Sequence, residues 1–251
     1  MKVTATTLVG GASVAISPDA YQCDVDPPTT INVIPTDAGW RLFPAEMSGG
    51  LRGGDTIHID IHLAPGSRAL WTPPASTQVF PGHGSELPVF VDYSVALDSG
   101  SRLIAMNQAT IPCFGAQLIQ TTDLQLAFDC ELLWFDVWSS GREAFGERWL
   151  FDRIKNSFCL TMGERSIYRE RWTLRSDSIP GGVAGFSGFG TMWTVILRRG
   201  NPGWDPRRSI SDRLESMGGI AEWGDLGDGF QILKGLTPPG YSALPSIEDL
   251  L

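Results

Sequence analysis

A short turn-and-strand unit recurs along the chain, and this recurrence constrains the fold more than any other feature. The unit reads LAPGSRALWT from Leu63, LDSGSRLIAM from Leu97 and LAFDCELLWF from Leu126. In the first two copies a phenylalanine, Phe80 or Phe114, follows seventeen residues after the leading leucine. Units of this size cannot bury an apolar face alone, so they must stack on one another. We therefore expect a mostly β, stacked, β-helix-like assembly of strands.

The segments around the repeat carry the alternation that is typical of half-buried strands. Residues 56–63, TIHIDIHL, alternate isoleucine with polar side chains. The runs 87–97 and 116–138 are similarly rich in β-branched and aromatic residues, and 152–174 predicts a hairpin that turns around Gly163. Strands are therefore expected through most of this region.

A helical pattern appears near the C-terminus. The segment 205–219, DPRRSISDRLESMGG, offers Ser209 or Ser211 as an N-cap and Gly218 as a stop. We expect one or two short helices there. A chain of 251 residues suits one large domain. We expect a single β-rich domain over 1–251, with core repeats in 48–175 and a C-terminal part in 200–251.

Composition narrows the classes of function. The net charge of −9 repels phosphate backbones, so nucleic acid is not an expected partner. No apolar run approaches the ~18 residues of a membrane span, and the N-terminus is a poor signal peptide. We therefore expect no membrane partner and a cytoplasmic location. The cysteines are dispersed without a C-x-x-C pair, which favours buried free thiols over a disulfide framework; they are Cys23, Cys113, Cys130 and Cys159.

The glycine-rich stretch SGGLRGGD at 48–55 raises the question of a phosphate site or a tight turn. A phosphate loop needs a following helix whose N-terminal amides hold the anion. Here Gly53, Gly54 and Asp55 lead directly into an alternating strand. We therefore expect a compact loop in which glycines supply positive φ angles or close backbone approach, and in which Asp55 bonds to neighbouring amides.

The strand after this loop is a candidate metal site. His58, Asp60 and His62 project from one face, because strand side chains alternate. Adjacent members lie about 6.6 Å apart and the two histidines about 13 Å apart, so one ion could be held by two of them at most. The simpler interpretation is a solvent-exposed polar face. An open, transient nickel or zinc site is the alternative, since imidazole suits both metals.

Three ordered motifs give the chain a resemblance to a known family. They read GGLRGGDTIHIDIHLAPGSRALWTPPASTQVF, LDSGSRLIAMNQATIPCFGAQL and ELLWFDVWSSGREAFGERW, all within 48–175. This region resembles the signature of the urease accessory protein D family, which is called H in some bacteria. The chain departs from the family pattern at Ala109 and within Thr72–Ser76. The motif residues that the resemblance carries over are Gly49, Gly50, Gly54, Asp55, Arg142 and Glu147.

The resemblance implies a non-catalytic protein. Members of the family are β-rich scaffolds that bind the helical accessory protein F, which recruits the nickel-carrying GTPase accessory protein G, and they dock on apo-urease. An internal passage is thought to carry nickel to the urease active site, and such a passage needs weak, exchangeable acidic or imidazole ligands. The resemblance therefore implies a role in urease metallocentre assembly, with transient nickel and no tightly bound cofactor.

Two alternatives stay open. A divergent family member would serve another metalloprotein, and the departures at Ala109 and Thr72–Ser76 motivate this reading. A carbohydrate-active β-solenoid enzyme would instead use a carboxylate pair in a long groove. Such an enzyme would also use tryptophan platforms, for which the candidates are Trp71, Trp134, Trp138, Trp149 and Trp172.

Overall fold

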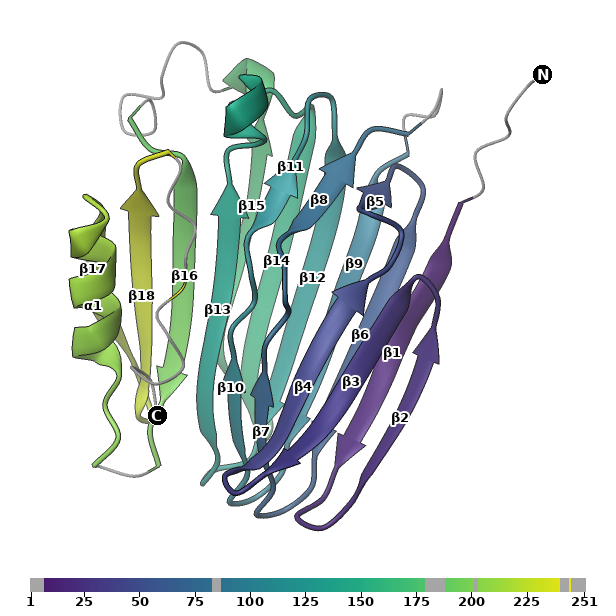
Figure 1. Ribbon diagram of the computed structural model, residues 1–251. Helices are drawn as coiled ribbons and strands as arrows, with labels where there is room; N and C mark the ends of the chain where they lie inside the picture. Colours follow the sequence, from purple (N-terminus) through teal and green to yellow (C-terminus); the bar gives the residue numbers. More distant parts are fainter. Residues whose placement is uncertain (1–6, 83–86, 179–187, 201–202, 240–243, 245–251) are drawn as a thin grey trace.

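Two β-sheets dominate the computed structural model, which describes residues 7–82, 87–178, 188–200, 203–239 and 244 (Figure 1). The sheets are not closed, and the prediction of a mostly β chain is confirmed. Sheet A runs in the order β15 (Arg165–Arg175), β14 (Arg153–Met162), β12 (Gln117–Leu126), β9 (Val89–Leu97), β6 (Thr56–Leu63), β1 (Val9–Ile16) and β2 (Tyr21–Asp26).

Sheet B lies over sheet A and contains the strands that follow each turn. It runs in the order β17 (Ile220–Gly227), β18 (Phe230–Thr237), β16 (Thr191–Arg198), β13 (Glu131–Ser139), β10 (Arg102–Ala105), β7 (Arg68–Trp71), β4 (Gly39–Glu46) and β3 (Thr29–Thr36). The short strands β5 (Leu51–Arg52), β8 (Thr77–Phe80) and β11 (Thr110–Pro112) pair beside this path.

Successive coils of the chain pass from sheet A through a tight turn into sheet B. Strands β6, β9, β12 and β14 are parallel in sheet A, and β7, β10 and β13 are parallel in sheet B. The leading residues of the three repeats, Leu63, Leu97 and Leu126, lie in register and are buried. The predicted stacking of the repeats is therefore confirmed. The fifth residue of each copy is also buried at the turn, as Ser67, Ser101 and Cys130.

Phe80 and Phe114, which share an offset of seventeen residues in the sequence repeats, are out of register by one residue in the structure. Strands β8 and β11 pair so that Val79 lies opposite Pro112, which brings Phe80 level with the residue before Phe114. The reason is the link Thr72–Ser76 between β7 and β8, which is one residue longer than the link between β10 and β11. Phe80 is consequently half-buried, whereas Phe114 is 63% exposed.

The predicted hairpin and the predicted helix both form. Strands β14 and β15 pair antiparallel around Gly163, which has a φ of +58°. Helix α1 (Arg207–Ser216) falls inside the predicted segment and is followed by Gly218, with a φ of +74°. Within the described residues, no helix is long and apolar enough to cross a membrane. Two 3₁₀ turns complete the elements, η1 (Glu143–Phe145) and η2 (Ser176–Ser178).

The N-cap predicted for α1 is wrong. Ser209 and Ser211 lie inside the helix rather than before it. The backbone N–H of Arg207 instead donates to the carboxylate of Asp205 at 3.2 Å, so this aspartate serves one of the free amides of the first turn. Pro206, whose fixed φ suits the start of a helix, lets α1 begin before either serine.

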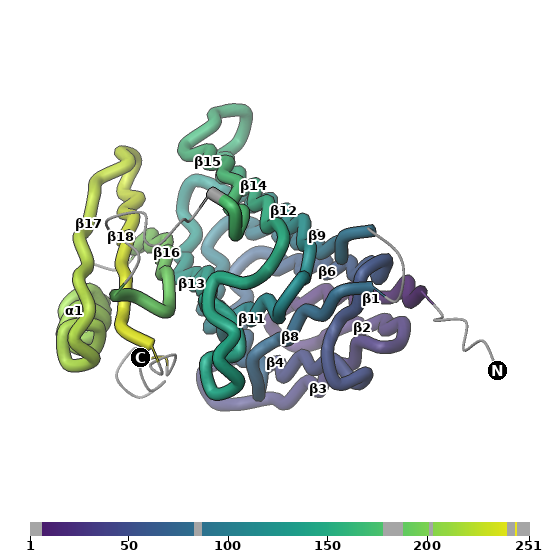
Figure 2. Tube along the Cα trace, turned by 90° about the horizontal axis from the view of Figure 1, so that it is seen from above, coloured from purple at the N-terminus to yellow at the C-terminus, as the bar shows by residue number. Residues whose placement is uncertain are grey.

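The two sheets form a wedge rather than a flat sandwich. Figure 2 shows them close together at β2 and β3 and more widely spaced toward β15 and β18, where Glu170 of β15 and Lys234 of β18 still form an ion pair. The main apolar core lies between the sheets, and a second cluster lies between sheet B and α1. The tryptophans considered as sugar platforms belong to the main core: Trp71, Trp134, Trp138 and Trp149 are buried, and Trp172 packs against them.

Candidate functional site

The glycine-rich loop is a turn that Asp55 holds in place. This residue is 3% exposed, and its carboxylate accepts hydrogen bonds from the backbone N–H groups of Leu8 (2.9 Å) and Arg52 (2.7 Å). Gly54 has a φ of +100°, a conformation that favours glycine. The expected compact loop is therefore present, and Asp55 ties the start of β6 to the segment before β1.

Positive φ values also explain the first glycine pair. Gly49 and Gly50 have φ values of +76° and +123°. A Cβ atom on Gly50 would lie 2.6 Å from the ring of Phe80, so this position requires close backbone approach. The carboxylate of Glu46 accepts hydrogen bonds from the backbone N–H groups of Ser48 (2.5 Å) and Gly50 (2.8 Å), which fixes the loop against β4.

Arg142 and Glu147 form an ion pair across a tight turn around η1. The guanidinium donates to both carboxylate oxygens, and the carboxylate also accepts the backbone N–H of Phe114 at 3.0 Å. The bonds from Arg142 hold the pKa of Glu147 below its ordinary value. The guanidinium lies 4.8 Å from the ring centre of Phe145 and 5.3 Å from that of Phe80.

Phe80 joins the two groups of family motif residues. Its ring contacts Gly50 on one side and lies 5.2 Å from the guanidinium of Arg52 and 5.3 Å from that of Arg142. The structure therefore brings the motifs at 48–55 and 141–147 together at one end of the coils, although 90 residues separate them. These contacts are those of a rigid structural junction.

The histidine strand lies elsewhere, on the outer face of sheet A. His58, Asp60 and His62 are all exposed, as the alternation predicts. His58 Nδ1 lies 3.2 Å from Asp92, and His62 Nε2 lies 3.0 Å from Asp98. Each imidazole thus has its own carboxylate neighbour on or after β9, and a metal site on this face stays a prediction.

Polar side chains that the motif analysis did not select enter the space between the sheets. On sheet A, Gln120 of β12 and Asn156 of β14 are paired in register and buried among leucine and isoleucine positions. Tyr93 of β9 and Glu170 of β15 occupy inward positions in the next cross-strand row of sheet A. Together they form the sheet A side of what we call the polar track.

The sheet B side of the polar track consists of Asp136, Thr194 and Lys234, which lie opposite one another on β13, β16 and β18. Asp136 accepts hydrogen bonds from the side-chain amides of Gln120 (3.2 Å) and Asn156 (3.3 Å), so it connects the two sheets. The ammonium of Lys234 donates to Thr194 (2.8 Å) and to both carboxylate oxygens of Glu170 (2.6 and 2.7 Å).

Burial controls the electrostatics of the track. Asp136 is 7% exposed, and burial raises the pKa of its carboxyl group above the ordinary value, while Trp138, Gln120 and Lys234 oppose that rise. Burial and the nearby Asp136 together raise the pKa of Tyr93 to about 12. The track therefore holds a carboxylate that is costly to keep charged unless a cation approaches it.

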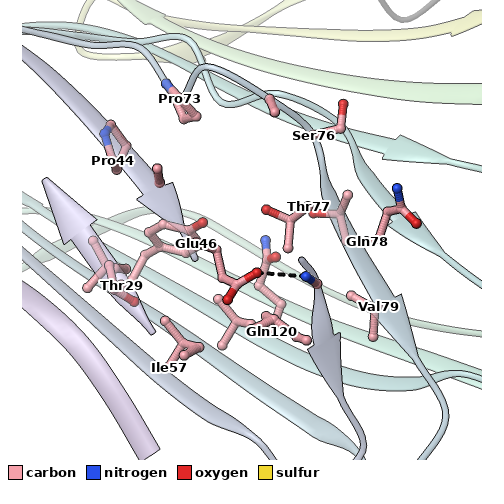
Figure 3. Close-up of a pocket in the computed structure, with 18 of the residues that line it drawn as sticks. Thr29, Pro44, Glu46, Ile57, Pro73, Ser76, Thr77, Gln78, Val79 and Gln120 are labelled. Carbon is pink, nitrogen blue, oxygen red and sulfur yellow. Dashed lines mark hydrogen bonds between the residues drawn. The ribbon is translucent and has the colours of Figure 1, made fainter. Parts of the chain in front are cut away.

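Two hollows lie near Asp136, which itself lines only a small extension of the first. The first, called here the inner cavity, has a volume of about 360 Å³, and Figure 3 shows Glu46, Thr77 and Gln120 on its wall. A small extension of about 30 Å³ continues past Tyr93 and Gln120 to Asp136. The second, called here the wedge groove, has a volume of about 590 Å³ between the diverging sheets. Its lining includes Trp138, Trp172, Glu170, Thr194, Glu222 and Lys234.

The track contains hydrogen-bonding groups that the protein itself does not satisfy. The hydroxyl of Thr122 and the side-chain oxygen of Asn156 are buried without a partner among the described residues. Unsatisfied oxygens beside a carboxylate are suited to receive a cation or its water shell. Nowhere in the described parts of the chain do three His, Cys, Asp or Glu side chains converge as a metal-binding group.

The sequence carries a signal for this track. In β12, Gln120 and Thr122 occupy the phase in which Leu118, Leu124 and Leu126 are buried. Polar residues in the apolar phase of a strand mark an interior that is not fully apolar. The same pattern marks two other residues of the track. The residues two positions before and after Asp136, on the same face of its strand, are both tryptophans, and those around Asn156 are an isoleucine and a phenylalanine.

The departures from the family pattern lie beside the inner cavity. Pro73, Pro74, Ala75 and Ser76 line it. Ala109 is fully buried, and its carbonyl accepts the backbone N–H of Thr77 at 3.1 Å. The departure within Thr72–Ser76 therefore changes the wall of the inner cavity, whereas Ala109 belongs to the second apolar cluster.

Comparisons with known proteins show the family to which the chain belongs. The family model of the UreD urease accessory protein matches residues 36–235. A urease accessory protein UreD of Sorangium cellulosum is 34% identical over 52% of this chain and 40% of its own length. A UreD of Anaeromyxobacter is 28% identical over 62% of this chain and 52% of its own length. A UreD of Rhodopseudomonas palustris is 27% identical over 75% of this chain and 68% of its own length. The chain thus spans about half the length of the first two relatives. It belongs to the family of UreD urease accessory proteins.

Proposed function

We propose that this chain is a non-catalytic scaffold that delivers nickel to apo-urease through its polar track. It does so in a complex with the helical accessory protein F, through which the nickel-carrying GTPase accessory protein G is recruited. The observation that carries the proposal is the buried carboxylate of Asp136, which connects both sheets and lines the extension of the inner cavity. Its strand partner Thr194 and the next residue across, Lys234, line the wedge groove. Nickel is the cargo and not a resident cofactor.

The ligand chemistry supports transport rather than storage. Carboxylate, amide and hydroxyl oxygens bind a borderline divalent cation more weakly than thiolate or imidazole sets do. The track offers Asp136 and Glu170 together with neutral oxygens, and the two carboxylates come from opposite sheets. An ion held by few charged ligands can leave again, which a delivery route requires.

Urease activation tests the proposal. Asp136→Asn removes one charge from the track while keeping its size, and Asp123→Asn removes one charge from the outer side of β12. In cells with the urease and other accessory genes of the source organism, we expect Asp136→Asn to lower urease activity about tenfold or more at equal urease abundance. Asp123→Asn should leave it unchanged. Equal activity for both variants would reject the polar track as the nickel route.

Complex formation tests the partner assignment. The chain should co-purify with accessory protein F and with apo-urease, and Asp136→Asn should co-purify equally well because its position is buried. Failure of the wild-type chain to retain accessory protein F under reducing, low-salt conditions would contradict the scaffold role. Loss of the complex only in the variant would show that its effect on activation is structural.

A divergent role has one observation in its favour. The Thr72–Ser76 segment, which departs from the family pattern, contributes Pro73, Pro74, Ala75 and Ser76 to the wall of the inner cavity. A changed cavity wall is compatible with delivery to a metalloprotein other than urease. Activation of urease by this chain in a host that lacks its own family member would exclude this alternative.

A further inference from the structure

Lys234 is the cation that the polar track already contains. Its ammonium lies within 2.8 Å of three oxygens, the hydroxyl of Thr194 and both carboxylate oxygens of Glu170. It also lies 6.0 Å from the ring centre of Tyr168. Three oxygens and an aromatic face form a coordination shell of the kind that a bound cation would otherwise occupy.

The position of Lys234 separates Asp136 from the wedge groove. Asp136, Thr194, Lys234 and Glu222 are consecutive partners across β13, β16, β18 and β17. The side chain of Lys234 is 43% exposed and that of Glu170 is 23% exposed, whereas Asp136 is 7% exposed. The ion pair therefore lies at the groove end of the track, and Asp136 lies behind it.

We propose that the ammonium of Lys234 is a displaceable counter-ion, which occupies Glu170 between cargo ions and prevents the polar track from retaining a divalent cation. This inference rests on the proposed function, because it concerns the regulation of the same route. An arriving divalent cation takes the carboxylate of Glu170, the lysine swings into the wedge groove, and the returning ammonium favours release of the ion. The groove gives the side chain room, and Glu222 of its lining offers a second carboxylate.

Charge counting supports this role. Counted in their ionised forms, Asp136, Glu170 and Lys234 carry a net formal charge of −1, and the two carboxylates without Lys234 carry −2, which matches a divalent cation. The positive charge also repels an ion at Asp136 directly. The two carboxylates without the lysine would bind divalent ions more tightly, and a tight site would trap the cargo.

The test compares Lys234→Met with Lys155→Met, which removes the same charge from the exposed outer face of β14. Methionine keeps most of the length of the lysine side chain and cannot bind Glu170 as a cation. In titrations of the purified full chain with NiCl₂, we expect Lys234→Met to bind Ni²⁺ about tenfold or more tightly and to release it to a chelator correspondingly more slowly. Lys155→Met should behave as the wild type does.

Urease activation provides the second readout. We expect Lys234→Met to lower activation because it retains nickel, and we expect Lys234→Arg to restore it, since arginine keeps the charge. Thermal melting identifies a variant that fails to fold, and in that case Glu170→Gln, which frees the lysine from its partner, should weaken Ni²⁺ binding. Ni²⁺ affinity of Lys234→Met equal to that of the wild type, or unmeasurable in both, would overturn the proposal.

The two proposals fail in different ways. Normal urease activation by Asp136→Asn would reject the nickel route itself, whatever Lys234 does. Reduced activation by Asp136→Asn together with unchanged Ni²⁺ binding by Lys234→Met would reject only the counter-ion role.

Discussion

Two stretches of the same strands contrast within the space between the sheets. Towards the repeat turns, one cross-strand row of sheet A consists of Ile61, Val95, Leu124 and Leu160, all buried and apolar. Four residues earlier on each strand, the equivalent row changes from apolar to polar along the sheet. It consists of Ile57, Val91, Gln120 and Asn156.

The contrast separates stability from function. The apolar row excludes water and supplies the free energy that holds the coils together. Three residues of the polar row line the inner cavity, and the side-chain oxygen of its fourth, Asn156, has no partner among the described residues, which reduces stability by itself. The same coils thus form an apolar core near the repeat turns and line a cavity four residues earlier on the strands, because only a few inward residues differ.

Truncation of the apolar row has the largest expected effect. Leu124→Ala removes a fully buried side chain and should lower the free energy of unfolding by about 2–5 kcal/mol. The matched change is Thr122→Val, two residues earlier on the same face, which replaces an unpartnered hydroxyl by a methyl group and should be neutral or stabilising. Denaturant unfolding measures both. A destabilisation by Thr122→Val as large as that by Leu124→Ala would contradict the claim that apolar rather than polar inward residues supply the stability.

Removal of the Asp55 carboxylate, which holds the glycine-rich loop, has the second-largest expected effect on stability. Asp55→Ala leaves two backbone N–H groups without their acceptor, which should cost about 1–3 kcal/mol. Asp60→Ala, on the exposed face of β6, should change stability by less than about 0.5 kcal/mol. If Asp55→Ala unfolds no more easily than Asp60→Ala but impairs urease activation, Asp55 belongs to the nickel route and not to the loop.

The pH dependence of stability probes Asp136 in the polar row. Because burial raises its pKa, the folded protein keeps a proton there at pH values at which the unfolded chain has lost it. The free energy of unfolding therefore falls as pH rises from the ordinary pKa to the raised one. Asp136→Asn removes this contribution, so its melting temperature should gain on the wild type as pH rises from about 4 to neutral. A difference that does not vary with pH would contradict the raised pKa.

The outer histidines have the smallest expected effect on stability. Replacing His58 and His62 together by alanine breaks two exposed pairs with Asp92 and Asp98, worth less than about 1 kcal/mol each. We expect calorimetry to show weaker Ni²⁺ binding, because the surface imidazoles are lost, while urease activation stays unchanged. Activation that falls as far as in Asp136→Asn would move the nickel route from the interior to the outer face.

The sequence predicts the fold better than the site. Periodicity and the leucine-led repeats are local signals, and they correctly predicted β6, the hairpin after Gly163 and the stacking of the coils. The N-cap serines of α1 failed because Asp205 and Pro206 compete for the same role within three residues. The equal offsets of Phe80 and Phe114 do not give equal positions, since one extra residue in a link shifts the register.

The polar track depends on contacts that the sequence does not state. Asp136, Asn156 and Lys234 come from distant strands and meet only because β13 and β18 share a sheet that faces β14. Asp136 lies within the third family motif, but the motif residues singled out from the sequence were Asp55, Arg142 and Glu147, whose side chains hold turns. Polar residues in an apolar phase indicate where the track begins, but only the pairing of the sheets shows where it leads.

Anomalous X-ray scattering at the nickel edge tests the central claim most directly. Crystals of the Lys234→Met variant soaked in NiCl₂ should show a nickel peak between the sheets, near Asp136 and Glu170. The wild type should show a weaker peak there. Nickel found only at His58 and His62 on the outer face, with none between the sheets in either protein, would contradict the account.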